Sequence, residues 1–373
     1  MSKTQLLSRR TRPWRMALTI SASLLGIAAC GSDEKRTDES AAVTSAAVSD
    51  SSATTSPAST STEADTTATD APTTDTMSSE TMTSETMSSD AGTTSAAGPF
   101  SVDADNGTVT LDERPTKIIS LSATHTETLF AIGAGDQVIA VDDQSDYPPE
   151  VEDVKSDLSG YTPNVEAIAG YEPDLVIVGG DFTGLGEQLA AVGIPVWSGD
   201  APETIDGAYD QIEQLGVLTG HVAEAAGVVA DMQTEIEKIL LDVPQTEEPL
   251  TFYHELDNTY YSIRSETFIG EVYSLAGLRN IADQAEVADA YVQLSAELII
   301  SANPDLIFLA DSECCGESSE TVAARDGWGD IAAVQNGNVF SLEDDLASRW
   351  GPRTVDFLRA VVDSVAAVTV PVG

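Results

Sequence analysis

The sequence predicts an α/β protein built from two Rossmann-like lobes that are joined by one long helix. Three observations carry this prediction. From residue 99 onward, short apolar runs alternate with helical patterns, one long helical pattern divides these runs into two sets, and a short sequence occurs once in each set. Alternating strands and helices favour parallel sheets covered by helices. About 275 residues of this kind exceed one comfortable core, so we expect two lobes.

The first 29 residues predict a bacterial lipoprotein signal peptide. Five basic residues precede an apolar stretch from Met16 to Ala29, which is too short to span a bilayer comfortably. The stretch ends in Ile27-Ala28-Ala29-Cys30, which resembles a lipobox and makes Cys30 the expected lipidation site. Two acyl chains on this cysteine would anchor the chain stably at the extracytoplasmic face of the cell membrane. The alternative is an ordinary signal peptide that happens to precede a cysteine.

Residues 30–98 predict a lipidated cysteine followed by a disordered Ser/Thr-rich tether, which is open to O-glycosylation. Large apolar side chains are nearly absent from this segment, so it cannot bury enough surface to offset the entropy of ordering. The whole chain has 17 Lys and Arg residues against 62 Asp and Glu residues, a formal net charge of -45. Such an acidic chain is not expected to bind nucleic acid.

The N-terminal lobe is expected to span residues 99–219 and the C-terminal lobe residues 244–373. Apolar runs bounded by turn residues predict buried strands in both lobes, and runs with helical spacing predict helices. The predicted strands are Ile118–Leu121, Val138–Val141, Leu175–Val178, Ile194–Trp197, Thr251–Leu256, Leu306–Leu309 and Val339–Leu342. The predicted helices include Thr126–Ile132, Gly184–Val192, Phe268–Ala276, Leu298–Ser301 and Val355–Val368.

Residues 220–243 predict the connecting helix. From His221 to Leu241 the sequence lacks proline and places apolar residues at helical spacing, and Pro244 ends the pattern. About twenty helical residues span roughly 30 Å, enough to cross from one lobe to the other. A stiff helix as the crossover would limit hinge motion, because a helix absorbs little φ/ψ change. The alternative is a surface helix that belongs to one lobe.

A short sequence is repeated in the two lobes. Glu166-Ala167-Ile168, four residues, and then Pro173-Asp174-Leu175 is matched by Glu297-Leu298-Ile299, four residues, and Pro304-Asp305-Leu306. Each copy predicts a short helix, a turn and a buried strand. The two glutamates are either ordinary charges at helix N-termini, or a matched pair that docks onto basic residues of a symmetric partner. The duplication favours docking.

Ligands of α/β proteins sit outside the carboxyl ends of the strands, so side chains that follow predicted strands are candidates for ligand contact. Several of these are aromatic, which favours a large planar ligand that stacks on flat rings. The candidates named on this ground are His125, Tyr147, Trp197, Tyr261 and Trp350. Basic residues in these loops are few, which disfavours a ferric siderophore rich in carboxylates. They are Arg264, Arg325, Arg349 and Arg353.

Histidine and cysteine leave alternatives open. His125 and His254 could hold a metal ion across the cleft or ligate the metal of a bound ligand, but isolated histidines with no metal are the simpler interpretation, and we expect no metal or cofactor of the protein itself. Cys314 and Cys315 are adjacent. In an oxidising compartment they predict a strained vicinal disulfide at the cleft rim, and the alternative is a pair of free thiols.

Five segments together resemble a known family in their order and spacing. They are RPTKIISLSATHTETLFAIGAGDQVIAV, SDYPPEV, NVEAIAGYEPDLVIV, YVQLSAELIISANPDLIFL and SRWGPRTVDFL, and they cover residues 114 to about 367. The chain is similar to the binding proteins of ABC importers for cobalamin, ferric siderophores and haem. This resemblance implies the helical-backbone fold of periplasmic binding proteins, with the ligand held between the lobes.

The resemblance also implies roles for single residues. Glu166 and Glu297 match the glutamates that dock onto arginines of the dimeric permease. Tyr147, in SDYPP, matches a tyrosine that faces the corrin ring in cobalamin-binding members, and Tyr161 is the nearest candidate for a second aromatic position. Three further residues match cleft positions: Tyr291, Asp345 and Arg349.

The predicted function is therefore capture of a cobalamin-like corrinoid and its delivery to an ABC permease that carries a cytoplasmic ATPase. A ferric siderophore or haem is the alternative ligand, and a surface adhesion or redox protein is the alternative class. We expect a monomer and no enzyme, because the sequence lacks a nucleophile elbow, a Walker loop, a metalloprotease helix and a dinucleotide fingerprint.

Overall fold

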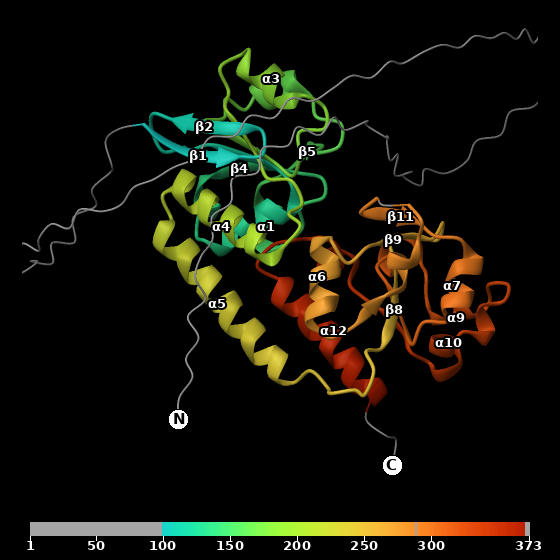
Figure 1. The fold of residues 1–373 in the computed structure, drawn as a ribbon. Coiled ribbons are helices and arrows are strands. Elements are labelled where there is room, and N and C mark those ends of the chain that lie inside the picture. Colours follow the sequence, from blue (N-terminus) through green and yellow to red (C-terminus); the bar gives the residue numbers. More distant parts are fainter. Residues whose placement is uncertain (1–98, 288, 370–373) are drawn as a thin grey trace, which may run out of the picture. The chain divides into compact units, whose positions relative to one another are not determined.

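A computed structural model describes residues 99–287 and 289–369. The predicted signal peptide, the lipidation site Cys30 and the tether lie outside the described residues. None of the helices within these two ranges is long and apolar enough to cross a membrane. The predicted α/β fold is confirmed (Figure 1). One parallel sheet is formed by strands that precede a long helix in the sequence, a second is formed by strands that follow it, and helices cover both sheets.

The N-terminal lobe contains a five-stranded parallel sheet in the order β5-β4-β3-β6-β7. Its strands are β3 (Ile118–Leu121), β4 (Val138–Asp142), β5 (Lys155–Leu158), β6 (Leu175–Val178) and β7 (Val196–Ser198). Its helices are α1 (Ala123–Ala131), α2 (Val165–Ala169), α3 (Leu185–Ala190) and α4 (Ile205–Thr219). Short 3-10 turns span Gly135–Gln137 and Pro149–Asp153.

The C-terminal lobe contains a four-stranded parallel sheet in the order β10-β8-β12-β13 and a small antiparallel pair, β9 with β11. Its strands are β8 (Thr251–Glu255), β9 (Tyr261–Ile263), β10 (Arg279–Asn280), β11 (Tyr291–Gln293), β12 (Leu306–Leu309) and β13 (Val339–Ser341). Its helices are α6 (Phe268–Leu275), α7 (Ala296–Ala302), α8 (Ser312–Cys315), α9 (Ser319–Ala323), α10 (Ala332–Asn336), α11 (Asp344–Ser348) and α12 (Thr354–Thr369), with 3-10 turns at Ile281–Gln284 and Trp328–Asp330.

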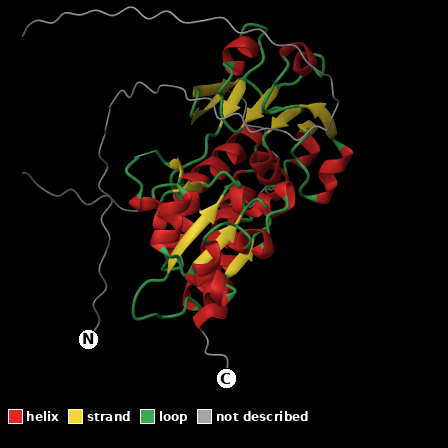
Figure 2. Ribbon diagram, turned by 90° about the vertical axis from the view of Figure 1, so that its right-hand side faces the viewer, coloured by secondary structure: helices red, strands yellow, loops and turns green. Residues whose placement is uncertain are grey.

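Alternate residues of the central strands pack into different cores, as the two-residue period of a strand requires. In β6, Leu175 and Ile177 join a core that also contains residues of α1, α4 and α5, whereas Val176 and Val178 pack with α2 and α3. All four side chains are buried, which explains why a continuous apolar run forms this strand. Figure 2 shows the strands of the two sheets as separate groups between layers of helices.

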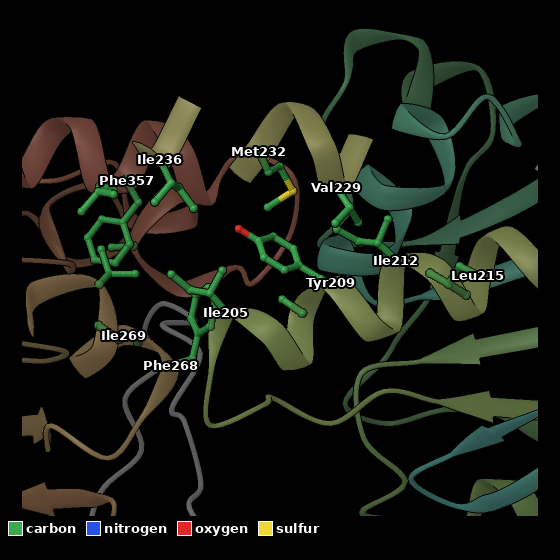
Figure 3. Close-up of a cluster of buried hydrophobic side chains, with 14 of the residues drawn as sticks. Ile205, Tyr209, Ile212, Leu215, Val229, Met232, Ile236, Phe268, Ile269 and Phe357 are labelled. Carbon is green, nitrogen blue, oxygen red and sulfur yellow. The ribbon is translucent and has the colours of Figure 1, made fainter. Parts of the chain in front are cut away.

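The predicted connecting helix is confirmed as α5 (Val222–Leu241). It does not act alone, because α4, which the sequence analysis did not identify, packs along it in the N-terminal lobe and α12 packs against it in the C-terminal lobe. One apolar core therefore runs from one lobe into the other (Figure 3). It includes Tyr209 of α4, Met232 of α5, Phe268 of α6 and Phe357 of α12.

A β-hairpin that was not predicted from the sequence precedes the first sheet. Its strands are β1 (Phe100–Ala104) and β2 (Gly107–Leu111), and they pair antiparallel. The residues of its turn bind the outer strand β7: the Asp105 N–H donates to the Ser198 carbonyl, and the Asn106 amide donates to the Val196 carbonyl. The hairpin thus covers the edge of the five-stranded sheet that β7 forms.

Candidate functional site

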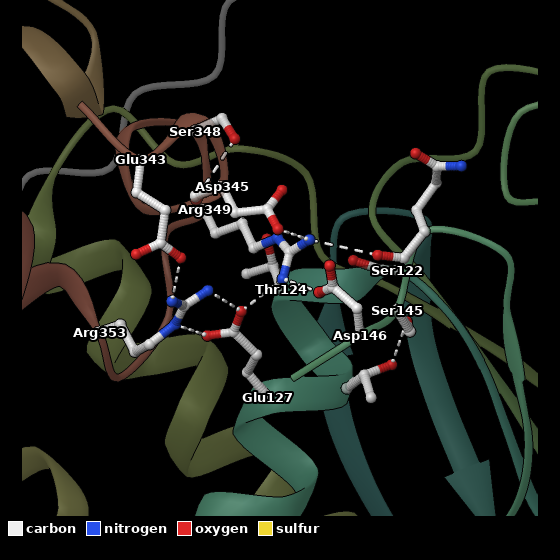
Figure 4. A network of polar contacts seen from close by, with 12 residues as sticks. Ser122, Thr124, Glu127, Ser145, Asp146, Glu343, Asp345, Ser348, Arg349 and Arg353 are labelled. Atoms are coloured by element: carbon white, nitrogen blue, oxygen red, sulfur yellow. Dashed lines mark hydrogen bonds and ion pairs between the residues drawn. The ribbon is translucent and has the colours of Figure 1, made fainter. Parts of the chain in front are cut away.

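A buried network of charged side chains joins the two lobes on the side where the parallel strands end (Figure 4). Its centre is Glu127 of α1, whose side chain is 2% exposed. Two arginines of the C-terminal lobe bind this carboxylate: Arg349 through one hydrogen bond of 2.7 Å, and Arg353 through two bonds of 2.9 and 2.8 Å. A carboxylate buried this deeply is stable only when it is paired and hydrogen-bonded, and the two guanidinium groups meet that need.

Arg349 was predicted to contact the ligand, but its side chain is 8% exposed and its donors are already used. Besides Glu127, it binds Asp146 at 3.0 Å and Asp345 at 2.6 Å, and it donates to the Gln144 carbonyl. Although burial acts in the opposite direction, the hydrogen bond to Glu127 raises the pKa of Arg349. Arg349 therefore joins the lobes through Glu127, Asp146 and Gln144, and Asp345 binds it from within its own lobe. Burial raises the pKa of Asp345, which Arg349 opposes.

Tyr147 lies beside this network with its side chain accessible. The residue is 44% exposed, it follows β4, and its peptide bond to Pro148 is cis. The Arg353 guanidinium carbon lies 4.3 Å from the centre of the Tyr147 ring, within the range of a cation–π contact. The predicted ligand residue is thus held on one side by the opposite lobe and is open to solvent elsewhere.

Three other predicted aromatic residues are also accessible. Tyr161, in the loop between β5 and α2, is 71% exposed, and Tyr291, the first residue of β11, is 43% exposed. Tyr261 begins β9, pairs with Gln293 and is half-buried. Phe182, which follows β6, is exposed as well. Exposed aromatic rings at strand ends provide flat apolar surface for a planar ligand.

His125 and Trp197 were predicted as ligand residues, and the structure places both in the interior. His125 is 1% exposed, and its Nε2 lies 2.9 Å from the Gly199 carbonyl. Burial lowers the pKa of His125 to about 4. Trp197 is fully buried, packs edge-on against His125 and donates its indole N–H to Gln214. The loop after β7 and helix α4 cover these rings, so neither ring is accessible to a ligand in this structure.

Trp350 occupies an intermediate position. It is half-buried, packs against the core that the lobes share, and donates its indole N–H across the lobe boundary to Gln211 of α4 at 2.9 Å. Its ring also lies edge-on to His125. Its polar atom is committed to the contact between the lobes, so only part of the ring is open to a ligand.

The alternative of a metal site across the cleft finds no support in the described part of the chain. His254 is fully buried, and its Nδ1 forms a hydrogen bond of 2.8 Å with the Tyr273 hydroxyl. Burial lowers the pKa of His254 to about 3. Among the residues of known position, no group of three or more His, Cys, Asp or Glu side chains is arranged to hold a metal ion.

The predicted vicinal disulfide is not formed in the structure. Cys314 and Cys315 are both free and exposed, and they are the last two residues of α8. Consecutive residues of a helix do not face each other, so a bridge between them would require this helix to unwind. Asp344 instead stabilises the helix start by accepting from the backbone N–H groups of Ser312 and Cys314.

The two glutamates of the repeated sequence occupy matching positions. Glu166 is the second residue of α2 and Glu297 is the second residue of α7, and both are exposed. The start of each helix is capped in the same manner, by the side chain of Asn164 in α2 and by that of Ser295 in α7. The two copies are therefore equivalent in local structure as well as in sequence.

Two surface hollows lie elsewhere, at the C-terminal end of α5. One, of about 200 Å³, is lined by residues of the loop that follows α5, by the residues just after α6 (276–278) and by Val365 of α12. The other, of about 530 Å³, is lined by residues of α5 itself. Neither contains a predicted ligand residue, so the accessible aromatic rings remain the candidates for ligand contact.

Comparison with known proteins places residues 118–346 within the family described as periplasmic binding protein. The chain is 30% identical to an uncharacterised ABC transporter substrate-binding lipoprotein of Bacillus subtilis, covering 70% of this chain and 84% of that protein. It is also 30% identical to a cobalamin-binding protein of Halobacterium salinarum, covering 72% of this chain and 74% of that protein.

Solved structures show the same likeness. A vitamin B12-binding protein of Vibrio cholerae is 26% identical with a TM-score of 0.58, covering 68% of this chain and 97% of that one. A possible iron-binding, periplasmic solute-binding protein of Staphylococcus epidermidis is 25% identical with a TM-score of 0.61, covering 68% of this chain and 99% of that one.

Proposed function

Because the chain belongs to the periplasmic binding protein family, we propose that it is the substrate-binding lipoprotein of an ABC importer and that it captures a cobalamin-like corrinoid between its two lobes. It acts by binding and delivery and carries out no chemistry on the ligand. The cobalamin-binding relative and the vitamin B12-binding structure support this choice of ligand. The lipid anchor on Cys30 is part of the proposal, supported by the leader sequence and by the lipoprotein relative.

The observation that carries the proposal is the set of accessible aromatic rings at the strand ends. Tyr147 and Tyr161 come from the N-terminal lobe and Tyr291 from the C-terminal lobe, and each is more than two-fifths exposed. A corrin ring is large, nearly flat and mostly apolar on its faces. It would bury much area against such rings at little entropic cost, because a tyrosine side chain has few rotatable bonds.

The charges around the rings favour a ligand without several carboxylates. All four basic residues of the strand-end loops are engaged by acids of the chain itself: Arg264 by Glu266 and Asp283, Arg325 by Glu255 and Glu317, and the pair Arg349 and Arg353 by Glu127. A polyanionic ferric siderophore would find these cations already neutralised. A corrinoid, whose periphery consists of neutral amides, requires none of them.

The experiment is a titration of the intrinsic tryptophan fluorescence of the purified chain with cyanocobalamin, haemin and ferrichrome, with calorimetry to confirm each positive result. We expect saturable binding of cyanocobalamin in the micromolar range or tighter, about -8 kcal/mol or better. Tyr147→Ala should weaken the binding of cyanocobalamin. Tyr171→Ala, which removes an exposed ring just after the end of α2, should leave that binding unchanged. Binding of ferrichrome or haemin with no response to cyanocobalamin would reject the corrinoid.

A ferric siderophore or haem is the second candidate. It is supported by the solved structure of the possible iron-binding protein, which is as similar in fold as the vitamin B12-binding one. The paired arginines restrict this candidate to ligands with few negative charges, such as a neutral hydroxamate complex. Ferrichrome in the titration above represents that class.

A further inference from the structure

We propose that Arg353 is a positioning residue for the ligand: from the C-terminal lobe, it fixes the orientation of the Tyr147 ring in the N-terminal lobe. This inference rests on the proposed function, in which Tyr147 contacts the ligand. It gives Arg353 and Glu127 an indirect role in binding, because they act on the ligand through the Tyr147 side chain.

The geometry that carries the inference begins at Glu127. This buried carboxylate receives two hydrogen bonds from Arg353, at Nε and at Nη2, so the guanidinium plane is fixed at two points. A third bond, from Nη1 to Glu343 at 2.9 Å, fixes the remaining nitrogen. These hydrogen bonds with Glu127 raise the pKa of Arg353, so the group stays charged. Arg353 therefore presents an immobile, flat cation.

The Tyr147 ring lies against this cation, 4.3 Å from the guanidinium carbon. A mobile exposed tyrosine would lose rotamer entropy on stacking against a ligand. A ring that is already held on one side by a fixed cation has lost part of that freedom before the ligand arrives. The contact also crosses the lobe boundary, because Tyr147 follows β4 and Arg353 precedes α12.

The alternative to this inference is that the arginines serve only to hold the lobes together, as Arg349 does. Arg349 binds the same Glu127 and also joins the lobes, but the guanidinium group that lies against the Tyr147 ring is that of Arg353. If the network served only to hold the lobes together, removing Arg353 would disturb binding through the lobes in general. If Arg353 acts through Tyr147, its effect on affinity must depend on the presence of that ring.

The first measurement does not need a ligand. The full chain is labelled with 3-fluorotyrosine, and the Tyr147 fluorine signal is assigned with Tyr147→Phe. We expect this signal to shift and broaden in Arg353→Met and in Arg353→Lys, since lysine keeps the charge but lacks the planar group. The matched control is Arg359→Met, which removes an arginine of α12, six residues further along the chain, that binds Glu235. That variant should leave the signal unchanged.

The second measurement is a double-mutant cycle on cyanocobalamin affinity. Arg353→Met should weaken binding about fivefold when Tyr147 is present and less than about twofold in the Tyr147→Ala background, because coupled residues give non-additive effects. Equal losses in both backgrounds, or an unmoved fluorine signal, would overturn the inference. If the native chain binds none of the three probes, the proposed function fails, and the fluorine signal alone decides whether Arg353 orders the ring.

Discussion

Asp311, which lies two residues after the end of β12, is a buried carboxylic acid. The residue is 0% exposed, and neither carboxyl oxygen has a hydrogen-bond partner within the described part of the chain. Burial, followed by repulsion from Glu255 and Glu317, raises the pKa of Asp311 to about 7, although the charge of Arg325 opposes this. The folded protein therefore holds a proton there that the unfolded chain releases near its ordinary pKa of 3.8.

The sign of the pH dependence follows from this difference. Since the pKa is higher in the folded state, the contribution of Asp311 to stability falls as the pH rises from about 4 to about 7, and the loss is complete above that range. Asp311→Asn removes this titration. Its free energy of unfolding in urea should exceed that of the native chain by about 1–3 kcal/mol at about pH 8, with a much smaller gain at about pH 5.

Asp231→Asn, which changes an exposed residue of α5, serves as the control for this comparison and should show no such pH-dependent gain. A gain for Asp311→Asn that is the same at both pH values would mean that the carboxyl group does not titrate in this range.

Single residues also mark the limit of sequence reasoning at the site. Tyr147, Tyr161 and Tyr291 were predicted to contact the ligand, and all three are exposed. His125 carries the same local signal, but its Nε2 is covered by the Gly199 carbonyl, 74 residues away. Glu127 and Arg353 are 226 residues apart, so their pairing could not be deduced from spacing.

At the scale of elements, the repeated helix–turn–strand unit forms the same hydrogen bonds in both lobes. Asp174 accepts from the backbone N–H and the hydroxyl of Thr116, just before β3. Asp305 accepts from the same two groups of Thr251, which begins β8. Each aspartate thereby ties the strand that follows it to the start of the neighbouring strand. Glu166 and Glu297 are therefore carried on two copies of one rigid unit.

This equivalence leads to a prediction about delivery. Glu166→Lys combined with Glu297→Lys should reduce uptake of cyanocobalamin into cells to background, because both charges that we expect to dock onto the permease are reversed at once. The affinity of the purified protein should stay within about twofold of the native value. Uptake of labelled cyanocobalamin and calorimetric titration measure the two quantities.

Glu187→Lys combined with Glu320→Lys is the matched control, since it reverses one exposed first-turn charge on a helix of each lobe. Uptake should persist in this variant. A parallel fall in uptake and in affinity for the Glu166 and Glu297 variant would show that these residues serve the ligand site and not the permease.

Elements with a strong local pattern were predictable, and those defined by distant contacts were not. The run Leu306–Leu309 forms β12 with the predicted bounds, because four consecutive apolar residues between turns leave few alternatives. Helix α4, which has a buried apolar face from Ile205 to Leu218, was not predicted, although it directly precedes the predicted helix α5. The hairpin β1–β2 alternates only weakly, since one residue of β1 and two of β2 are buried.

At the scale of the whole described unit, the two lobes share one apolar core. Helices α4, α5, α6 and α12 contribute to it, and polar bonds border it, including the Ile205 N–H donating to Glu271 at 2.6 Å. The sequence suggested lobes held apart by one helix. The shared core instead implies that neither lobe can unfold without exposing apolar surface of the other, because that surface is buried between them.

The shared core predicts a single cooperative unfolding transition. Trp197 lies in the core that the lobes share and Trp328 in the separate core of the C-terminal lobe. In variants that keep one or the other as the only tryptophan of the described region, the urea midpoint from fluorescence should equal the midpoint from far-UV circular dichroism. A Trp328 signal that changes at a distinctly lower urea concentration would show that the C-terminal lobe unfolds on its own.

The hairpin that covers β7 has a consequence for neighbouring copies of the protein. An outer strand with free amide and carbonyl groups is a template on which another chain can add a strand, and sheets grow into aggregates in this way. Here the turn residues Asp105 and Asn106 already occupy the outward groups of Val196 and Ser198. Neighbouring copies of the protein would therefore meet at this edge without extending the sheet from one copy into the next.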